Sequence, residues 1–121
     1  MKRNLIRLIM LWVVMLGCNA PASSTTICQI DKAQQYLREA EQYNKQAEQY
    51  EREARSYTEK AQSYMREAER CTRNKDYSRA NTYTQWANQA FDKARLYLSW
   101  ASDARAKAQQ RARWAEDAMR K

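Results

Sequence analysis

Alanine recurs at every seventh position through most of this chain, and no other feature constrains the fold as strongly. One series runs from Ala33 to Ala68 and a second from Ala80 to Ala115. Tyrosine stands three residues after each of the first five alanines, at Tyr36, Tyr43, Tyr50, Tyr57 and Tyr64. A sustained seven-residue repeat with two small or apolar positions is typical of helices that pack along a shared seam.

Helix-breaking residues are almost absent from the repeat region. The chain of 121 residues has one glycine, Gly17, and one proline, Pro21. Alanine and long polar side chains, which favour helix, dominate the rest. Because large aliphatic side chains are scarce, we expect the buried surface to consist of alanine, tyrosine and tryptophan along long helices. The sequence therefore predicts an all-α fold.

The two alanine series do not share a phase, and the break between them predicts a turn. Ala68 and Ala80 are twelve residues apart. Between them, Asn74 suits a left-handed helix end and Asp76 suits an N-cap.

We therefore expect a first coiled-coil helix over 31–73, a turn at 74–76 and a second coiled-coil helix over 77–121. Each helix would be about 65 Å long. Equal arms on a short turn predict a long antiparallel helical hairpin with an Ala/Tyr-heptad seam, assembling into a helical bundle. The alternative is one bent or continuous helix in a parallel oligomer.

The first residues have the order of a secretory signal peptide. Lys2, Arg3 and Arg7 precede a short apolar run over 8–16, and small and polar residues follow. The apolar run is too short to span a bilayer. We expect a signal peptide over 1–17, or over 1–22, and an N-terminal linker over 18–30.

Two cleavage sites compete. The run Met15-Leu16-Gly17-Cys18 is similar to a bacterial lipobox, in which the cysteine becomes the lipidated first residue of the mature protein. The rival is Ala20-Pro21-Ala22, an A-x-A site that would release a soluble protein beginning at Ser23. The position of Cys18 directly after the apolar run favours lipidation.

The positive charge lies mainly in the second half of the chain. The formal net charge is +8, of which the signal segment supplies three. Residues without an intervening acid form a basic stretch: Arg105, Lys107, Arg111 and Arg113. Such a stretch can contact phosphates, lipid head groups or cell-wall polymer, although it is more often a solvated helix face.

The second arm carries a further repeat of fourteen residues. Trp86, Trp100 and Trp114 each precede a seam alanine. We interpret these tryptophans as bulky cover over the seam. The alternative is an exposed ladder that stacks nucleotide bases, although export of the protein argues against nucleic acid as a partner.

Three cysteines leave an odd count unless Cys18 is lipidated or removed. On one unbroken helix, Cys28 and Cys71 would lie about 65 Å apart, far beyond the about 4.4–6.8 Å between Cα atoms of a disulfide. The hypothesis is therefore an interchain link, Cys28 of one chain to Cys71 of another, in a two-fold dimer of hairpins. The alternative is two free or mispaired thiols, and an intrachain bond would require the first arm to fold back near Asn44.

The sequence lacks the residues of common catalytic and cofactor sites. It has no histidine, no glycine-rich phosphate loop and no CxxC pair. Its carboxylates alternate with basic residues as in helix-face ion pairs. We expect no enzymatic activity, no metal and no cofactor.

Three features together resemble the alanine-zipper murein lipoproteins of Gram-negative outer membranes: the lipobox-like Cys18, the alanine heptads and the final pair Arg120-Lys121. In that family the cysteine carries lipid and the last lysine is joined to peptidoglycan. The resemblance implies a lipid anchor at Cys18 and a peptidoglycan attachment point at Lys121.

The expected function is that of an exported, non-enzymatic protein of the bacterial periplasm or outer membrane. It would serve as a structural or protein-interaction module, self-associate through the heptad seam, and contact peptidoglycan or envelope proteins. The alternatives are a soluble secreted protein, a binder of anionic polymer or nucleic acid through the basic second helix, or an accessory of a secretion or conjugation system.

Overall fold

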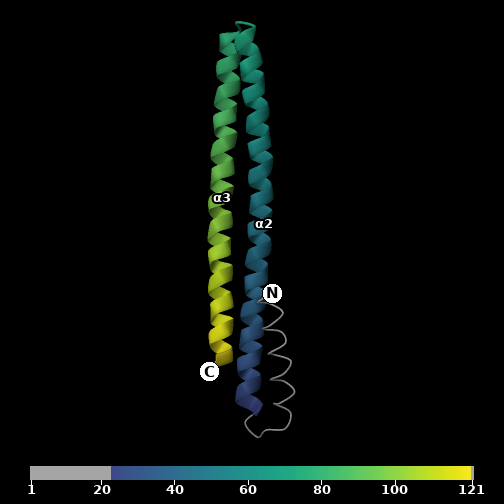
Figure 1. Cartoon of the computed structure of the whole chain (residues 1–121), viewed down its shortest axis with the longest axis vertical. Helices are drawn as coiled ribbons and strands as arrows, with labels where there is room; N and C mark the ends of the chain where they lie inside the picture. The colour runs from purple at the N-terminus through teal and green to yellow at the C-terminus, as the bar shows by residue number, and fades with distance from the viewer. Residues whose placement is uncertain (1–22, 121) are drawn as a thin grey trace. The chain divides into compact units, whose positions relative to one another are not determined.

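The fold is a helical hairpin of two long helices. The computed structural model describes residues 23–120, with side chains from residue 26 onward. Helix α2 spans Ser23–Arg73 and helix α3 spans Tyr77–Arg120 (Figure 1). The predicted signal peptide, Cys18 and Lys121 lie outside the described residues. Neither α2 nor α3 contains an apolar stretch of the length needed to span a bilayer.

The first helix begins at Ser23, eight residues before the expected start at residue 31. Residues 23–30, assigned to a linker over 18–30, form the first two turns of α2. The segment contains no glycine or proline to stop a helix, and Ile30 is buried at 5% exposure. Burial of the Ile30 side chain stabilises helix where the alanine repeat has not yet begun.

The C-terminal end of α2 is closed by a Schellman cap. The Asp76 amide donates to the Cys71 carbonyl at 2.8 Å, and the Lys75 amide donates to the Thr72 carbonyl at 3.0 Å. Lys75 has a φ of 61°, so Lys75 and not Asn74 adopts the left-handed conformation. The cap geometry requires that conformation at the second residue after the last helical one, which is why the expectation for Asn74 was wrong by one position.

Asp76 also begins the second helix. Its Oδ1 accepts a hydrogen bond from the Arg79 amide at 3.3 Å, and its carbonyl accepts from the Ala80 amide at 3.1 Å. These are the contacts of an N-cap residue. One residue thus ends the cap of α2 and starts α3, so the turn is only three residues long.

The chain divides into two compact units, and the alanine seam is buried in both. Unit 1 consists of residues 23–42 and 108–120, and unit 2 consists of Tyr43–Lys107 with the turn. In unit 1, Ala33 packs against Ala115. In unit 2, Ala47 packs against Ala101 and Ala104.

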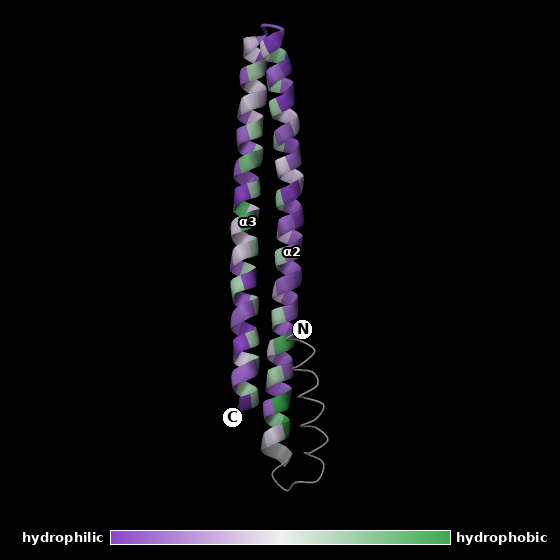
Figure 2. Cartoon of the chain, viewed as in Figure 1, coloured by the Kyte–Doolittle hydropathy of each residue, from purple (hydrophilic) through white to green (hydrophobic). Residues whose placement is uncertain are grey.

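The register of the seam follows from the position of the turn. Ala33 and Ala115 are equally distant along the chain from Asn74, and so are Ala47 and Ala101. The other seam alanines obey the same rule and are also buried: Ala40 and Ala108, Ala54 and Ala94, Ala61 and Ala87, Ala68 and Ala80. Hydrophobic positions accordingly interrupt the hydrophilic surface at intervals along both helices (Figure 2).

Candidate functional site: the aromatic side of the hairpin

In unit 2, the tyrosines of α2 meet tryptophan and lysine of α3 in alternation. The tyrosines stand three residues after the α2 alanines, and their α3 partners stand one residue before the α3 alanines. The pairs along the helix are Tyr43 with Lys107, Tyr50 with Trp100, Tyr57 with Lys93, and Tyr64 with Trp86. We call the surface formed by these eight residues the aromatic side.

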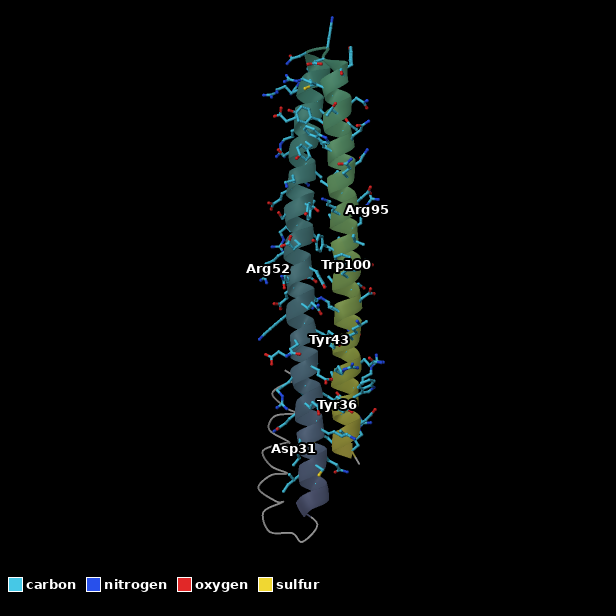
Figure 3. All side chains as sticks on the ribbon, turned by 180° about the vertical axis from the view of Figure 1, so that it is seen from behind. Asp31, Tyr36, Tyr43, Arg52, Arg95 and Trp100 are labelled. Carbon is cyan, nitrogen blue, oxygen red and sulfur yellow. The ribbon has the colours of Figure 1, made fainter. Side chains whose placement is uncertain are left out.

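The contacts within the aromatic side are of two kinds. The ring centroids of Tyr50 and Trp100 lie 5.6 Å apart, as do those of Tyr64 and Trp86. The Lys93 Nζ lies 5.3 Å from the centre of the Tyr57 ring, which is the geometry of a cation–π contact. Figure 3 shows Tyr43 and Trp100 between the two ribbons, whereas Arg52 and Arg95 point outward.

A second α3 position explains the fourteen-residue repeat. Three residues after successive α3 alanines stand Tyr83, Ala90, Tyr97 and Ala104. Tyrosine at this position accompanies a tryptophan, as in the edge-on contact of Tyr97 with Trp100 at 5.2 Å. Alanine at this position accompanies a lysine. The repeat therefore alternates a tyrosine–tryptophan pair of α3 with an alanine–lysine pair of α3. Tyr57, which Lys93 covers, also stacks on Tyr97 with ring centroids 5.6 Å apart.

Unit 1 repeats the aromatic pair but replaces the second tyrosine with an arginine. The ring centroids of Tyr36 and Trp114 lie 5.5 Å apart, and the ring planes make an angle of 70°. Arg111 occupies the position of Tyr97, its guanidinium carbon 4.2 Å from the centre of the Trp114 ring. The Arg111 Nε lies 2.8 Å from Glu39 Oε2. A planar cation thus takes the place of a ring in the cluster.

The tryptophans are packed on one side and exposed on the other. The fraction of the residue surface that stays exposed to solvent is 45% for Trp86, 41% for Trp100 and 39% for Trp114. Their ring contacts agree with the interpretation of the tryptophans as cover over the seam. The remaining exposed surface is nevertheless large for aromatic side chains and is available for contact with another molecule.

Each unit has a shallow recess beside a tryptophan. One recess of unit 2, about 260 Å³, is lined by Gln46, Tyr50, Trp100, Asp103, Ala104 and Lys107. A further recess of unit 2, about 470 Å³, lies near the turn beside Met65, Thr72 and Thr84 and contains no aromatic side chain. The recess of unit 1, about 510 Å³, is lined by Gln29, Lys32, Tyr36, Trp114, Asp117 and Ala118. Neither recess beside a tryptophan is predicted by the sequence, because each is lined by side chains of both α2 and α3.

Three of the four residues of the predicted basic stretch have partners on α2. Arg105 pairs with Glu51 at 2.8 Å, and Arg111 pairs with Glu39 at the same distance. Lys107 lies over the Tyr43 ring, 5.7 Å from its centre. Arg113 is exposed. Acidic residues of α2 neutralise the two arginines that would otherwise be the strongest anion contacts.

The two described cysteines differ in access. Both thiols are free, Cys28 exposed and Cys71 buried at 8% exposure. Helix α2 runs without interruption through both positions. A second chain can reach Cys28 directly, whereas little of the Cys71 side chain is exposed to one.

Within residues 23–120, no three histidine, cysteine, aspartate or glutamate side chains gather where they could hold a metal ion. The aromatic side and the recesses at Trp100 and Trp114 combine aromatic with charged side chains. Comparison with known proteins adds no assignment: no protein-family model, curated protein or solved structure matches the chain.

Proposed function

We propose that this protein is an exported helical module of the bacterial cell envelope that works by binding other molecules and not by catalysing a reaction. The observation that carries the proposal is that the hairpin buries its own alanine seam yet leaves Trp86 and Trp100 about two-fifths exposed. Partly exposed tryptophan beside tyrosine and basic residues is characteristic of interaction surfaces. The signal-like first segment supports export.

Lipidation at Cys18 would attach this module to a membrane. In unit 1, the first part of α2 packs against the last part of α3 through Ala33 and Ala115. The end of α3 therefore returns to the helix that follows Cys18. This arrangement favours a hairpin anchored at one end over a rod that joins lipid at Cys18 to peptidoglycan at Lys121, which stays the less supported role.

The anchor is tested by expressing the protein in a bacterium with lipoprotein processing. Mass spectrometry should find a mature chain that begins at lipid-modified Cys18 and fractionates with membranes. Cys18→Ser should release it, whereas the control Cys28→Ser should not. A soluble mature chain that begins at Ser23 would contradict lipidation and support the A-x-A site. If digested cell wall contains the peptide that ends in Lys121, the result would support attachment of Lys121 to peptidoglycan.

Self-association is the second part of the proposal. The exposed Cys28 thiol offers a direct reporter of it. A non-reducing gel should show a dimer that disappears in Cys28→Ser, and sedimentation of that variant tests whether the association persists without the covalent link. A chain that sediments as a monomer at all concentrations would exclude the dimer and the helical bundle.

A binder of anionic polymer or nucleic acid is the alternative, and one observation favours it: Lys93 and Lys107 alternate with tryptophans on the aromatic side. The ion pairs of Arg105 and Arg111 weaken it. Binding of single-stranded oligonucleotide that falls steeply with salt would support it. An accessory role in secretion or conjugation would be supported by co-purification with components of such a machine.

A further inference from the structure

The two recesses beside a tryptophan share one plan. Their lining residues correspond after a step of fourteen residues forward on α2 and fourteen back on α3. Tyr36 then corresponds to Tyr50. Likewise Trp114 corresponds to Trp100, and Asp117 to Asp103. The same step relates Ala118 to Ala104 and Lys32 to Gln46. Each recess therefore has an alanine, an indole, a phenol, a carboxylate and a hydrogen-bond donor from α2. The repetition of this set in two places argues for a common ligand.

The polar groups of the recesses limit the charge of that ligand. Each recess combines a carboxylate with a lysine, namely Asp103 with Lys107 and Asp117 with Lys32. The carboxylate repels an anion and the ammonium group repels a cation, so neither charge is favoured at both groups. A neutral ligand with several hydroxyl groups can use both, since hydroxyls donate to carboxylate and accept from ammonium.

The aromatic groups limit the shape of the ligand. Trp100 and Trp114 each keep about two-fifths of their surface exposed beside a tyrosine. An indole face carries a negative quadrupole that attracts weakly positive C–H groups. A pyranose ring presents C–H groups on one face and hydroxyls around its edge. Such a ring matches an indole flanked by polar side chains.

One donor of the unit 2 recess is already held in position. The Gln46 Nε2 donates to the Tyr50 hydroxyl at 3.2 Å. This bond restricts the amide, whose carbonyl oxygen and second N–H group can each form a further hydrogen bond. Groups held in place before binding lose less conformational entropy when a ligand arrives.

We propose that the recesses at Trp100 and Trp114 each bind a pyranose ring of a neutral oligosaccharide. The ring would stack on the indole, with hydroxyls bonded to the aspartate and to the neighbouring lysine or glutamine. This binding activity goes beyond the envelope role proposed above and does not depend on it, because it rests on residues of the described hairpin alone.

The chain contains its own control at Trp86. A further step of fourteen residues on each helix leads from Tyr50 and Trp100 to Tyr64 and Trp86. At this third place Gln89 takes the position that Asp103 and Asp117 have in the two recesses. Trp86 packs on Tyr64 as Trp100 packs on Tyr50, at the same centroid distance of 5.6 Å. It has the aromatic pair without the carboxylate, so it should not bind the sugar comparably.

Nuclear magnetic resonance of ¹⁵N-labelled protein tests the proposal with the N-acetylglucosamine tetramer as the probe. The indole N–H groups of Trp86, Trp100 and Trp114 are separate reporters, each assigned by substitution with phenylalanine. Titration should shift the Trp100 and Trp114 signals saturably and leave the Trp86 signal in place. No shift, or equal shifts of all three signals, would overturn the proposal.

A pair of charge-matched variants isolates the carboxylate. Asp103→Asn should weaken binding at Trp100 about tenfold and leave binding at Trp114 unchanged, because at one recess only the hydroxyl then donates to a neutral amide oxygen and not to a carboxylate. Asp92→Asn removes the same charge from an exposed position and should change neither. Equal effects of the two variants would refute a role for Asp103. A polyphosphate that shifts Trp100 more strongly than the sugar would show an anion site instead.

Discussion

At the scale of single residues, the seam combines small and large side chains that have different tasks. The alanines are buried almost completely, for example Ala47 at 0% and Ala101 at 3% exposure. A methyl side chain lets the two backbones approach closely, and the neighbouring tyrosines then fill the wider space beside the seam. Alanine is required here for its size, whereas on the outer faces it serves only as a helix former.

Replacement of a seam alanine by leucine should therefore destabilise the hairpin. We expect Ala101→Leu to lower the free energy of unfolding by about 1–3 kcal/mol, because the larger side chain forces the helices apart. The matched control is Ala106→Leu, an exposed position on the same helix, with an effect within about 0.5 kcal/mol. Urea denaturation measures both. Equal stability of the two variants would contradict close packing at Ala101.

Arg111 is the one cation that occupies a seam position otherwise held by tyrosine or alanine. Its guanidinium contacts both the Glu39 carboxylate and the Trp114 ring. Lysine can replace the charge but not the planar stacking. We expect Arg111→Lys to cost about 1 kcal/mol of unfolding free energy.

Arg105→Lys supplies the comparison for that prediction, because Arg105 pairs with Glu51 on a more exposed surface. Its loss should be smaller, within about 0.5 kcal/mol. Double-mutant cycles with Glu39→Gln and Glu51→Gln would give the coupling energies directly. An equal loss of unfolding free energy in Arg111→Lys and Arg105→Lys would show that the contact of Arg111 with the Trp114 ring contributes nothing.

At the scale of the elements, both helices end and begin within a single short cap. Lys75 has a side chain at a position whose left-handed φ of 61° favours glycine. The Schellman hydrogen bonds from Lys75 and Asp76 hold this conformation in spite of its cost. The cap is therefore a place where the natural sequence does not use the most stable residue.

We expect Lys75→Gly to raise the free energy of unfolding by about 0.5–1 kcal/mol, since glycine adopts positive φ without steric cost. Asn74→Gly is the control, because no positive φ is required of Asn74, and it should give no gain. Thermal denaturation followed by circular dichroism distinguishes them. A gain in Asn74→Gly alone would place the left-handed residue one position earlier.

At the scale of the whole molecule, the turn determines which residues meet. The tyrosines of α2 recur every seven residues. On their own they would therefore allow α3 to pair with α2 in registers that differ by seven or fourteen residues. The cap at Asn74–Asp76 leaves one register, in which the seam alanines are equidistant from Asn74. The ion pairs of Glu39 with Arg111 and of Glu51 with Arg105 then occur only in that register.

A paired deletion should test this dependence on register. Removal of residues 50–63 together with 85–98 takes one fourteen-residue repeat from each arm and keeps every other seam pair aligned. We expect a less stable hairpin that still unfolds cooperatively and keeps its helical content per residue. Removal of 50–63 alone shifts the partners of Tyr36 and Glu39 and should abolish the Arg111–Glu39 coupling energy. Retention of that coupling would refute the assigned register.

Much of the architecture is readable from local patterns, and the candidate site is not. The register break between Ala68 and Ala80 predicted the turn, and the structure has the helices end at Arg73 and begin at Tyr77. The start of α2 was misjudged because Ile30 stabilises a segment without seam alanines. The recesses and the pairing of Arg105 and Arg111 were missed because their partners are far apart in the chain.

The sequence by itself determined the helices, the seam and the place of the turn, since each depends on residue spacing within one helix or on a few neighbouring residues. The tertiary structure alone decided that tyrosines of α2 meet alternating lysine and tryptophan of α3. It also decided that Glu39 and Glu51 form ion pairs with two residues of the predicted basic stretch, and that Gln46 of α2 and Asp103 of α3 line one recess. The physical reason is that a heptad repeat sets which face of a helix is buried, while the cap sets the register that brings particular residues of two helices together.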